Sequence, residues 1–150
     1  MKIAIGNDHA AIEMKQHIVK YLEDQGHELI DLGIGSGESA DYPRPAEAVA
    51  KLVVSGGADR GILICGTGIG VSLAANKVHG VRCACVSEAV SARMCRAHND
   101  CNLIAFGARI VGAQTAESIV DAFLNTEHEG GRHARRVDLI MKIEREQSCN

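Results

Sequence analysis

The sequence predicts an α/β protein, a single domain in which helices cover both faces of a parallel sheet. Strand-like and helix-like segments alternate along the 150 residues, as expected for strands joined by crossover helices. Apolar residues make up 46% of the chain, enough for one core, and no linker, repeat or low-complexity stretch divides it. Because only 3% of the residues are aromatic, the core should be aliphatic.

The first half of the chain contains three predicted strands. Residues 2–6 form a short apolar run, and residues 10–25 then place apolar side chains at helical spacing. A second strand is expected at 28–32 and a second helix at 45–55. Residues 60–65 are nearly all apolar, which is typical of a strand buried on both faces.

The second half continues the alternation after a glycine-rich turn at residues 66–70. Strands are expected at residues 81–86 and 103–106, and helices at residues 71–77, 87–98, 115–124 and 132–146. The crossovers should be right-handed. In such folds, ligands bind outside the carboxyl ends of the strands.

Composition excludes several classes of protein. The net charge of −3 argues against nucleic-acid binding, which requires clustered basic residues. No apolar run reaches the roughly 18–20 residues that span a bilayer, and the short apolar start does not resemble a secretory signal. We therefore expect a cytoplasmic protein with reduced cysteines and no Cys-x-x-Cys metal site. The cysteines besides Cys65 have no predicted role: Cys83, Cys85, Cys95, Cys101 and Cys149.

The segment Cys65-Gly66-Thr67-Gly68-Ile69-Gly70 indicates chemistry most strongly. Its cysteine ends a buried strand, and glycines at alternate positions let backbone N–H groups converge on an anion beside the start of a helix. Such surroundings favour a thiolate, which could act as a nucleophile or a base while the N–H groups stabilise an oxyanion. The alternative is a buried thiol followed by a tight structural turn.

The residues in this segment exclude three familiar loops. The glycine spacing differs from the Gly-x-Gly-x-x-Gly of dinucleotide-binding proteins, and the Gly-Lys-Ser/Thr of a P-loop is missing. A tyrosine-phosphatase loop would place an arginine where this chain has Val71.

Basic side chains provide further candidates. Arg132 and Arg136 lie four residues apart on one predicted helix face, which suits a phosphate dianion, although a solvated basic face is the alternative. His9 and His98 follow the ends of predicted elements and are the preferred acid–base candidates. We interpret the remaining histidines as structural: His17, His27, His79, His128 and His133.

Six motifs in register resemble the family of ribose-5-phosphate isomerase B, which also includes allose-6-phosphate and galactose-6-phosphate isomerases. The motifs are Gly6-Asn7-Asp8-His9-Ala10, Asp41-Tyr42-Pro43, Cys65 to Gly70, Ala74-Ala75-Asn76-Lys77, His98-Asn99-Asp100-Cys101-Asn102 and Gly130-Gly131-Arg132-His133-Ala134-Arg135-Arg136. The resemblance extends to about Glu146.

This resemblance implies a Rossmann-like three-layer α/β/α sandwich with a five-stranded parallel sheet. It also implies catalysis without a metal or organic cofactor, and a homodimer or homotetramer with active sites shared between subunits. The helix at about 132–146 would then pack at a subunit interface. The implied reaction converts ribose 5-phosphate to ribulose 5-phosphate through an enediolate, in the non-oxidative pentose phosphate pathway.

The resemblance also assigns roles to individual residues. Cys65 would move the proton between C1 and C2 with help from Thr67, and His98 would open the sugar ring. One branch of the family uses a glutamate six residues after the cysteine position, where this chain has Val71, so Cys65 is the candidate base. The expected substrate-binding residues are Asp8, His9, Tyr42, Gly66, Gly68, Ile69, Gly70, Asn99, Arg109, Arg132 and Arg136.

Two features of this assignment concern geometry. His9, Arg109, Arg132 and Arg136 would cluster at the phosphate and the sugar. His98, Asn99 and Arg109 would come from the neighbouring subunit. A six-carbon sugar phosphate as substrate, or a non-catalytic sugar-phosphate-binding subunit, are the alternatives.

Overall fold

A computed structural model describes residues 1–35 and 41–147 of the chain. Five parallel strands form one sheet in the order β2-β1-β3-β5-β4. The strands are β1 (Lys2–Asn7), β2 (Glu28–Asp31), β3 (Arg60–Cys65), β4 (Cys83–Cys85) and β5 (Leu103–Gly107). The predicted α/β fold with a five-stranded parallel sheet is therefore confirmed, and Cys149 lies outside the described residues.

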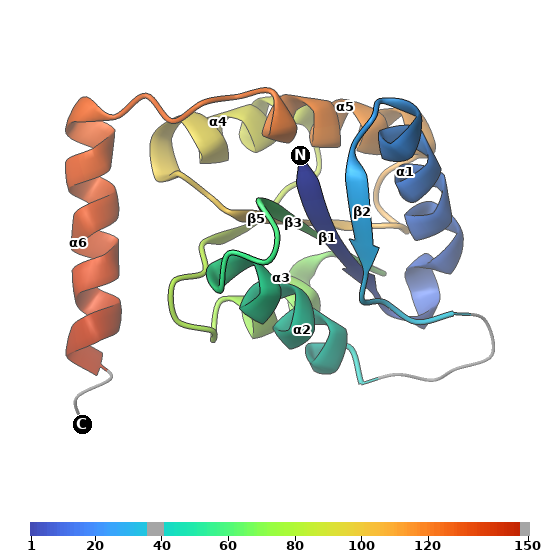
Figure 1. Ribbon diagram of the computed structural model, residues 1–150, viewed down its shortest axis with the longest axis horizontal. Helices are drawn as coiled ribbons and strands as arrows, with labels where there is room; N and C mark the ends of the chain where they lie inside the picture. The colour runs from blue at the N-terminus through green and yellow to red at the C-terminus, as the bar shows by residue number, and fades with distance from the viewer. Residues whose placement is uncertain (36–40, 148–150) are drawn as a thin grey trace.

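Helices cover both faces of the sheet, which gives the three layers visible in Figure 1. The helices are α1 (Ile12–Asp24), α2 (Pro43–Val54), α3 (Ile69–Ala75), α4 (Ala89–Asn99), α5 (Ala113–Leu124) and α6 (Gly131–Gln147), with a short 3₁₀ helix η1 (His9–Ala11) before α1. α1, α4 and α5 pack on one face, and α2 and α3 on the other. Among the described residues, no helix combines the length and the apolar character needed to cross a membrane.

The core is mostly aliphatic, as predicted, although the α1/α4/α5 face also buries both phenylalanines, Phe106 and Phe123. Ile3, Ile5, Ile62 and Ile64 point toward the α1/α4/α5 layer, while Ala4 and Leu63 point toward the α2/α3 layer. This alternation follows from the period of two along a strand, and all of these side chains are fully buried. The central strands are therefore apolar on both sides, which leaves polar chemistry to their ends.

Helix α6 differs from the other helices because it stands beside the body (Figure 1) and packs mainly against α4. Among its described side chains, only His133 and Val137 are buried. Leu139, Ile140 and Ile143 remain exposed at 55%, 45% and 61%. Large apolar side chains that lie exposed on one element indicate a surface that another protein covers.

Candidate active site

The carboxyl ends of β1, β3 and β5 meet at one edge of the sheet. The register pairs Asn7 with Ile64 and Cys65 with Gly107. The backbone N–H of Asp8 donates to the carbonyl of Ile64 at 3.2 Å, and that of Ala108 donates to the carbonyl of Cys65 at 2.8 Å. Residues that follow these three strands are therefore neighbours, as the parallel topology requires.

Cys65 ends β3 with its thiol held inside the glycine-rich loop. The side chain is 5% exposed, and the N–H of Gly68 lies 3.0 Å from Sγ. The loop backbone thus contacts the sulfur directly. This contact supports a chemical role for the loop, which the sequence alone left open against a plain structural turn.

Gly68 is required at its position for two reasons. Its φ of +81° lies in the left-handed region, and a Cβ atom there would come within 2.8 Å of the Phe106 backbone. This close approach seats the loop directly on β5. Thr67 is exposed at the loop's tip, and its Oγ1 accepts a hydrogen bond from Ile69 N–H at 3.3 Å. Helix α3, which follows, has only seven residues.

Asp8 and the buried Asn7 lie at the carboxyl end of β1. Asp8 is 8% exposed, and its Oδ1 accepts from the N–H of Ala10 at 2.9 Å, which caps η1. Asn7 is fully buried and holds the next segment, because its Oδ1 accepts from Ile34 N–H at 3.1 Å. A Cβ on Gly33 would lie 1.9 Å from that oxygen, so only glycine at position 33 lets the segment pack this closely against Asn7.

The remaining neighbours of the loop are Tyr42 and Arg109. A Cβ on Gly70 would lie 2.8 Å from the ring of Tyr42, so the two residues are in close contact. The side chain of Arg109 passes Gly66, whose Cβ position is 3.5 Å from Nη1, and Arg109 N–H donates to the Gly66 carbonyl at 3.1 Å. The same chain thus supplies Arg109 beside Cys65, whereas the resemblance implied that it comes from a neighbouring subunit.

His98 and Asn99 lie at the opposite edge of the sheet. They end α4, and Asn102, just beyond them, accepts a hydrogen bond from Gly61 N–H at 3.0 Å, at the start of β3. Cys65 lies four residues further along that strand, roughly 13 Å away at the usual rise per residue. One chain therefore does not bring His98 to Cys65.

Arg132 and Arg136 belong to the same distant edge as His98. They lie on the first turns of α6, and His133 between them stacks on His98 with ring centroids 4.1 Å apart and an interplanar angle of 2°. His9 instead follows β1, on the Cys65 side. The expected cluster of His9, Arg109 and both α6 arginines therefore does not form within one chain. His9 and Arg109 lie on the Cys65 side of the sheet, whereas the two arginines lie on the His98 side.

Glu129 and His133 extend the group around His98. Glu129 Oε2 lies 3.7 Å from His98 Nε2 and 3.4 Å from His133 Nε2. Sequence reasoning interpreted His133 as structural and did not single out Glu129. The signal that could have found them is a carboxylate and an imidazole four residues apart, just before and at the start of the helix that carries the arginines.

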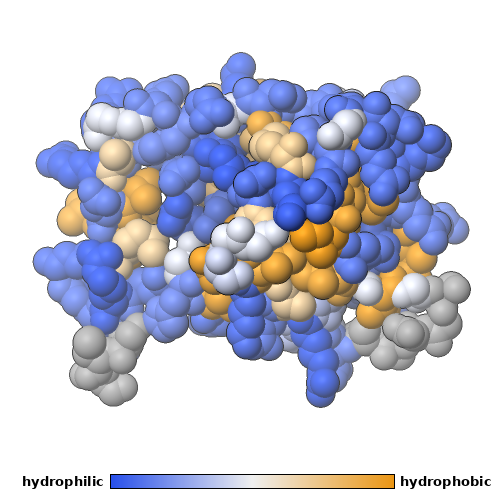
Figure 2. Space-filling view, viewed as in Figure 1, coloured by the Kyte–Doolittle hydropathy of each residue, from blue (hydrophilic) through white to orange (hydrophobic). Residues whose placement is uncertain are grey.

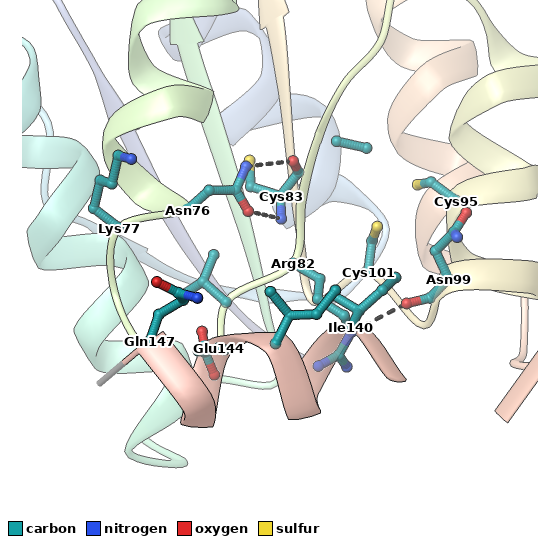
Figure 3. Close-up of a pocket in the computed structure, with 13 residues that line it drawn as sticks. Asn76, Lys77, Arg82, Cys83, Cys95, Asn99, Cys101, Ile140, Glu144 and Gln147 are labelled. Carbon is teal, nitrogen blue, oxygen red and sulfur yellow. Dashed lines mark hydrogen bonds between the residues drawn. The ribbon is translucent and has the colours of Figure 1, made fainter. Parts of the chain in front are cut away.

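A cavity of about 640 Å³ lies between α6 and the body, away from Cys65 (Figure 3). Ile140, Glu144 and Gln147 of α6 line one side, and Cys83, Cys95 and Cys101 line the other. Burial raises the pKa of Cys83 far above its usual value, so this thiol stays protonated. The side chain of Asn76 makes two hydrogen bonds to the backbone of Cys83: it donates to the carbonyl and accepts from the N–H. We infer a packing surface rather than a second reactive site.

The fold and the thiol-bearing glycine loop correspond to a defined class of enzymes. The chain belongs to the Ribose/Galactose Isomerase family, whose sequence profile matches residues 3–140.

Named relatives narrow the comparison within that family. The chain is 51% identical to "Ribose-5-phosphate isomerase B" of Escherichia coli (strain K12) over 95% of this chain and 96% of the relative. It is 42% identical to "D-erythrulose-4-phosphate isomerase" of Pectobacterium atrosepticum, over 93% of each chain.

Solved structures agree with the sequence comparisons. Ribose-5-phosphate isomerase B of Clostridium thermocellum superposes with a TM-score of 0.96 at 50% identity, over 98% of this chain and 99% of that one. The enzyme of Mycoplasma genitalium with bound ribulose-5-phosphate gives a TM-score of 0.89 at 40% identity, over 97% of each chain.

Proposed function

We propose that this chain is an aldose–ketose isomerase that interconverts D-ribose 5-phosphate and D-ribulose 5-phosphate, as in the non-oxidative pentose phosphate pathway. The observation that carries the proposal is the Cys65 thiol, held 3.0 Å from the Gly68 N–H at the carboxyl edge of the sheet. The close relatives named for this reaction, at up to 51% identity among those cited, support the same conclusion.

Catalysis begins with opening of the furanose ring. His98 acts as the acid–base group that protonates the ring oxygen and accepts the proton of the C1 hydroxyl, which leaves an aldehyde at C1. Imidazole is suited to both transfers near neutral pH. Asn99, beside it, contacts the sugar.

Proton transfer between carbons follows at the glycine-rich loop. The Cys65 thiolate removes the proton from C2, and the electron pair forms a C1–C2 double bond while the negative charge moves onto O1. Backbone N–H groups from Gly66 to Gly70 stabilise this enediolate, and Thr67 assists proton movement between O1 and O2. Return of the proton from sulfur to C1 yields the ketose. Removing one such oxyanion donor typically costs about 2.7–4 kcal/mol in other enzymes.

The phosphate anchors the substrate away from the reacting carbons. Arg132, Arg136 and His9 supply the positive charge, and Arg109 and Asp8 contact the sugar. Tyr42 and Ile69 limit the length of the pocket at the loop. Binding energy from a remote phosphate helps to hold the reacting carbons in place.

The site becomes complete only in a homodimer, or in a tetramer built from such dimers. Cys65 and His98 lie at opposite edges of one sheet, so a two-fold partner supplies the half that each chain lacks. Helix α6 carries the surface for this contact through Leu139, Ile140 and Ile143. Figure 2 shows that apolar patches interrupt the polar surface on the face viewed in Figure 1. We further propose a cytoplasmic location, because a base thiol works only while it is reduced.

A panel of sugar phosphates tests the proposed function. Purified protein should convert ribose 5-phosphate faster than allose 6-phosphate or galactose 6-phosphate, with conversion measured by proton exchange and product formation. Preference for a six-carbon substrate would reassign the protein within its family. No conversion of any of them would contradict a stand-alone isomerase and favour a non-catalytic sugar-phosphate-binding subunit.

A further inference from the structure

His98, Glu129 and His133 bring three metal-ligating atoms to one point. The separations of 3.7 Å and 3.4 Å from Glu129 Oε2 to the two Nε2 atoms belong to a set in which all ligand atoms lie within 4.8 Å of one another. A tetrahedral zinc ion bound at about 2.0–2.2 Å holds its ligands roughly 3.3 Å apart. The cluster is therefore close to the dimensions of a three-ligand zinc site.

We propose that His98, Glu129 and His133 bind one divalent transition-metal ion of the zinc class, and that this ion inhibits ring opening by occupying Nε2 of His98. Two imidazoles and one carboxylate favour Zn²⁺, Co²⁺ or Ni²⁺ over Mg²⁺ and Ca²⁺, which prefer all-oxygen sites. The inhibitory part rests on the proposed function of His98, whereas the binding part does not.

The protein fixes the backbone of Glu129 and the side chain of His133 before any ion arrives. The N–H of Glu129 donates to the carbonyl of Ala97 at 2.9 Å, and His128 Nδ1 lies 3.0 Å from that same carbonyl. The segment that carries Glu129 is thus fixed to the end of α4. His133 is buried, with a side chain 9% exposed. A site with preordered ligands loses less conformational entropy when it binds an ion.

The surroundings of His133 suit a metal ligand. Arg132 Nε donates to His133 Nε2 at 3.4 Å, which places the lone pair on the nitrogen that faces Glu129. Metal binding requires this lone pair, and the ion would take the place of the guanidinium donor.

Binding also has costs that define its character. The two rings are parallel, whereas an imidazole lone pair lies in its ring plane, so the half-exposed His98 must tilt out of the stack to share an ion. The cationic Arg132 and Arg136 oppose a metal ion. We therefore expect a reversible inhibitory ion rather than a resident cofactor.

Calorimetric titration of the chelator-treated full chain with ZnCl₂ tests binding directly. We expect one ion per chain, no binding of MgCl₂, and binding at least about 100-fold weaker in Glu129→Gln and in His133→Gln, beyond the effect typical of second-shell changes. His17→Gln is the matched control, because His17 Nε2 contacts Glu117 Oε1 at 2.7 Å in a pair with only two ligands. Unchanged binding in both cluster variants, or loss of binding in Cys85→Ser instead, would overturn the site.

A second measurement tests inhibition. Saturating ZnCl₂ should slow conversion of ribose 5-phosphate at least tenfold, EDTA should restore it, and Glu129→Gln should raise the required zinc concentration at least tenfold. Full turnover with the site loaded would overturn the inhibitory role. If the metal-free protein converts no sugar phosphate, the proposed function fails, while the calorimetric result still decides whether the metal site exists.

Discussion

At the scale of single residues, Cys65 is distinguished by its environment rather than by its residue type. Of the five cysteines that the structure describes, Cys65 has a backbone N–H directed at its sulfur from a glycine loop. Burial raises the pKa of Cys83, and likewise that of Cys85 to a lesser degree. Cys65 is as buried as Cys83, so its contact with the loop N–H, and not its exposure, sets it apart.

Cys65→Ala should abolish isomerisation, with a loss of at least 10³-fold in kcat, while substrate binding changes little. The variant removes the proposed base but keeps the arginines proposed to bind phosphate and the loop amides. Turnover assays and calorimetric binding of ribose 5-phosphate check the two halves of this expectation. Cys85→Ser serves as the control for a nearby thiol, and retained turnover in Cys65→Ala would refute the assignment of the base.

His98→Asn should impair conversion of ribose 5-phosphate far more than conversion of erythrose 4-phosphate. The four-carbon sugar carries its phosphate on O4, so it forms no furanose ring and needs no ring opening. Comparing kcat/KM for the two substrates isolates that step. An equal loss on both would show that His98 serves the later proton transfer or binding instead.

At the scale of elements, each half of the site depends on how one segment begins or ends. The loop after β3 rests on the backbone of Phe106, which only a glycine at position 68 permits. The end of α4 is fixed by Asp100, which has a φ of +46° and accepts charge-assisted bonds from Arg96 and Arg82. These local contacts hold the Cys65 thiol on one side of the sheet and His98 on the opposite side.

Gly68→Ala should lower both stability and turnover. The left-handed φ and the 2.8 Å approach to Phe106 both oppose a methyl group, and strain at such a position costs on the order of 1–3 kcal/mol. Gly26→Ala separates the two causes, because Gly26 has φ +85° and nothing within 4 Å of its Cβ position. Thermal unfolding and kcat are the measurements; equal effects in both variants would mean that the contact with β5 is unimportant.

Asp100→Asn should destabilise the protein by about 1–2 kcal/mol at pH 7, less than for a fully buried pair because its side chain is 37% exposed. Burial alone would raise the pKa of Asp100, but Arg96 and Arg82 outweigh it and lower that pKa. The lowered pKa means that this stabilisation is complete above the usual aspartate value of about 3.9. It is lost as the pH falls through the folded-state pKa.

Denaturant unfolding between pH 7 and pH 2 measures this difference. Wild type and Asp100→Asn should differ most at neutral pH and converge in strong acid. Asparagine tolerates the left-handed conformation, so the comparison reports the charge rather than the backbone. A difference that stays constant with pH would contradict the role of the carboxylate.

At the scale of the whole molecule, the sequence predicted the architecture more completely than the site. The continuous apolar run at 60–65 follows from burial on both faces, and the spacing in 10–25 from the helical period of 3.6 residues. Both are local properties of the sequence. Which edge of the sheet receives His98 depends on the direction of α4 against the strands. That is a property of the three-dimensional fold, so the sequence alone could not show that one chain keeps Arg132 and His9 apart. Their grouping at a phosphate site shared between subunits stays a prediction.

Mixed subunits test the division of the site. Inactive Cys65→Ala and inactive His98→Asn chains, once unfolded together and refolded, should regain up to about a quarter of wild-type activity, because half of the random dimers contain one intact site. Each variant refolded alone is the control. No recovery in the mixture would show that both residues act within one chain.

The separation of Cys65 from His98 has a genetic consequence. In the proposed homodimer, a chain that carries a single defect in one half leaves its normal partner able to complete one of the two sites, so a single defective allele should be partly recessive. A chain defective in both halves removes both sites from every mixed dimer. Co-expressed with the normal gene, such an allele should behave as a dominant inhibitor although it still folds and assembles normally.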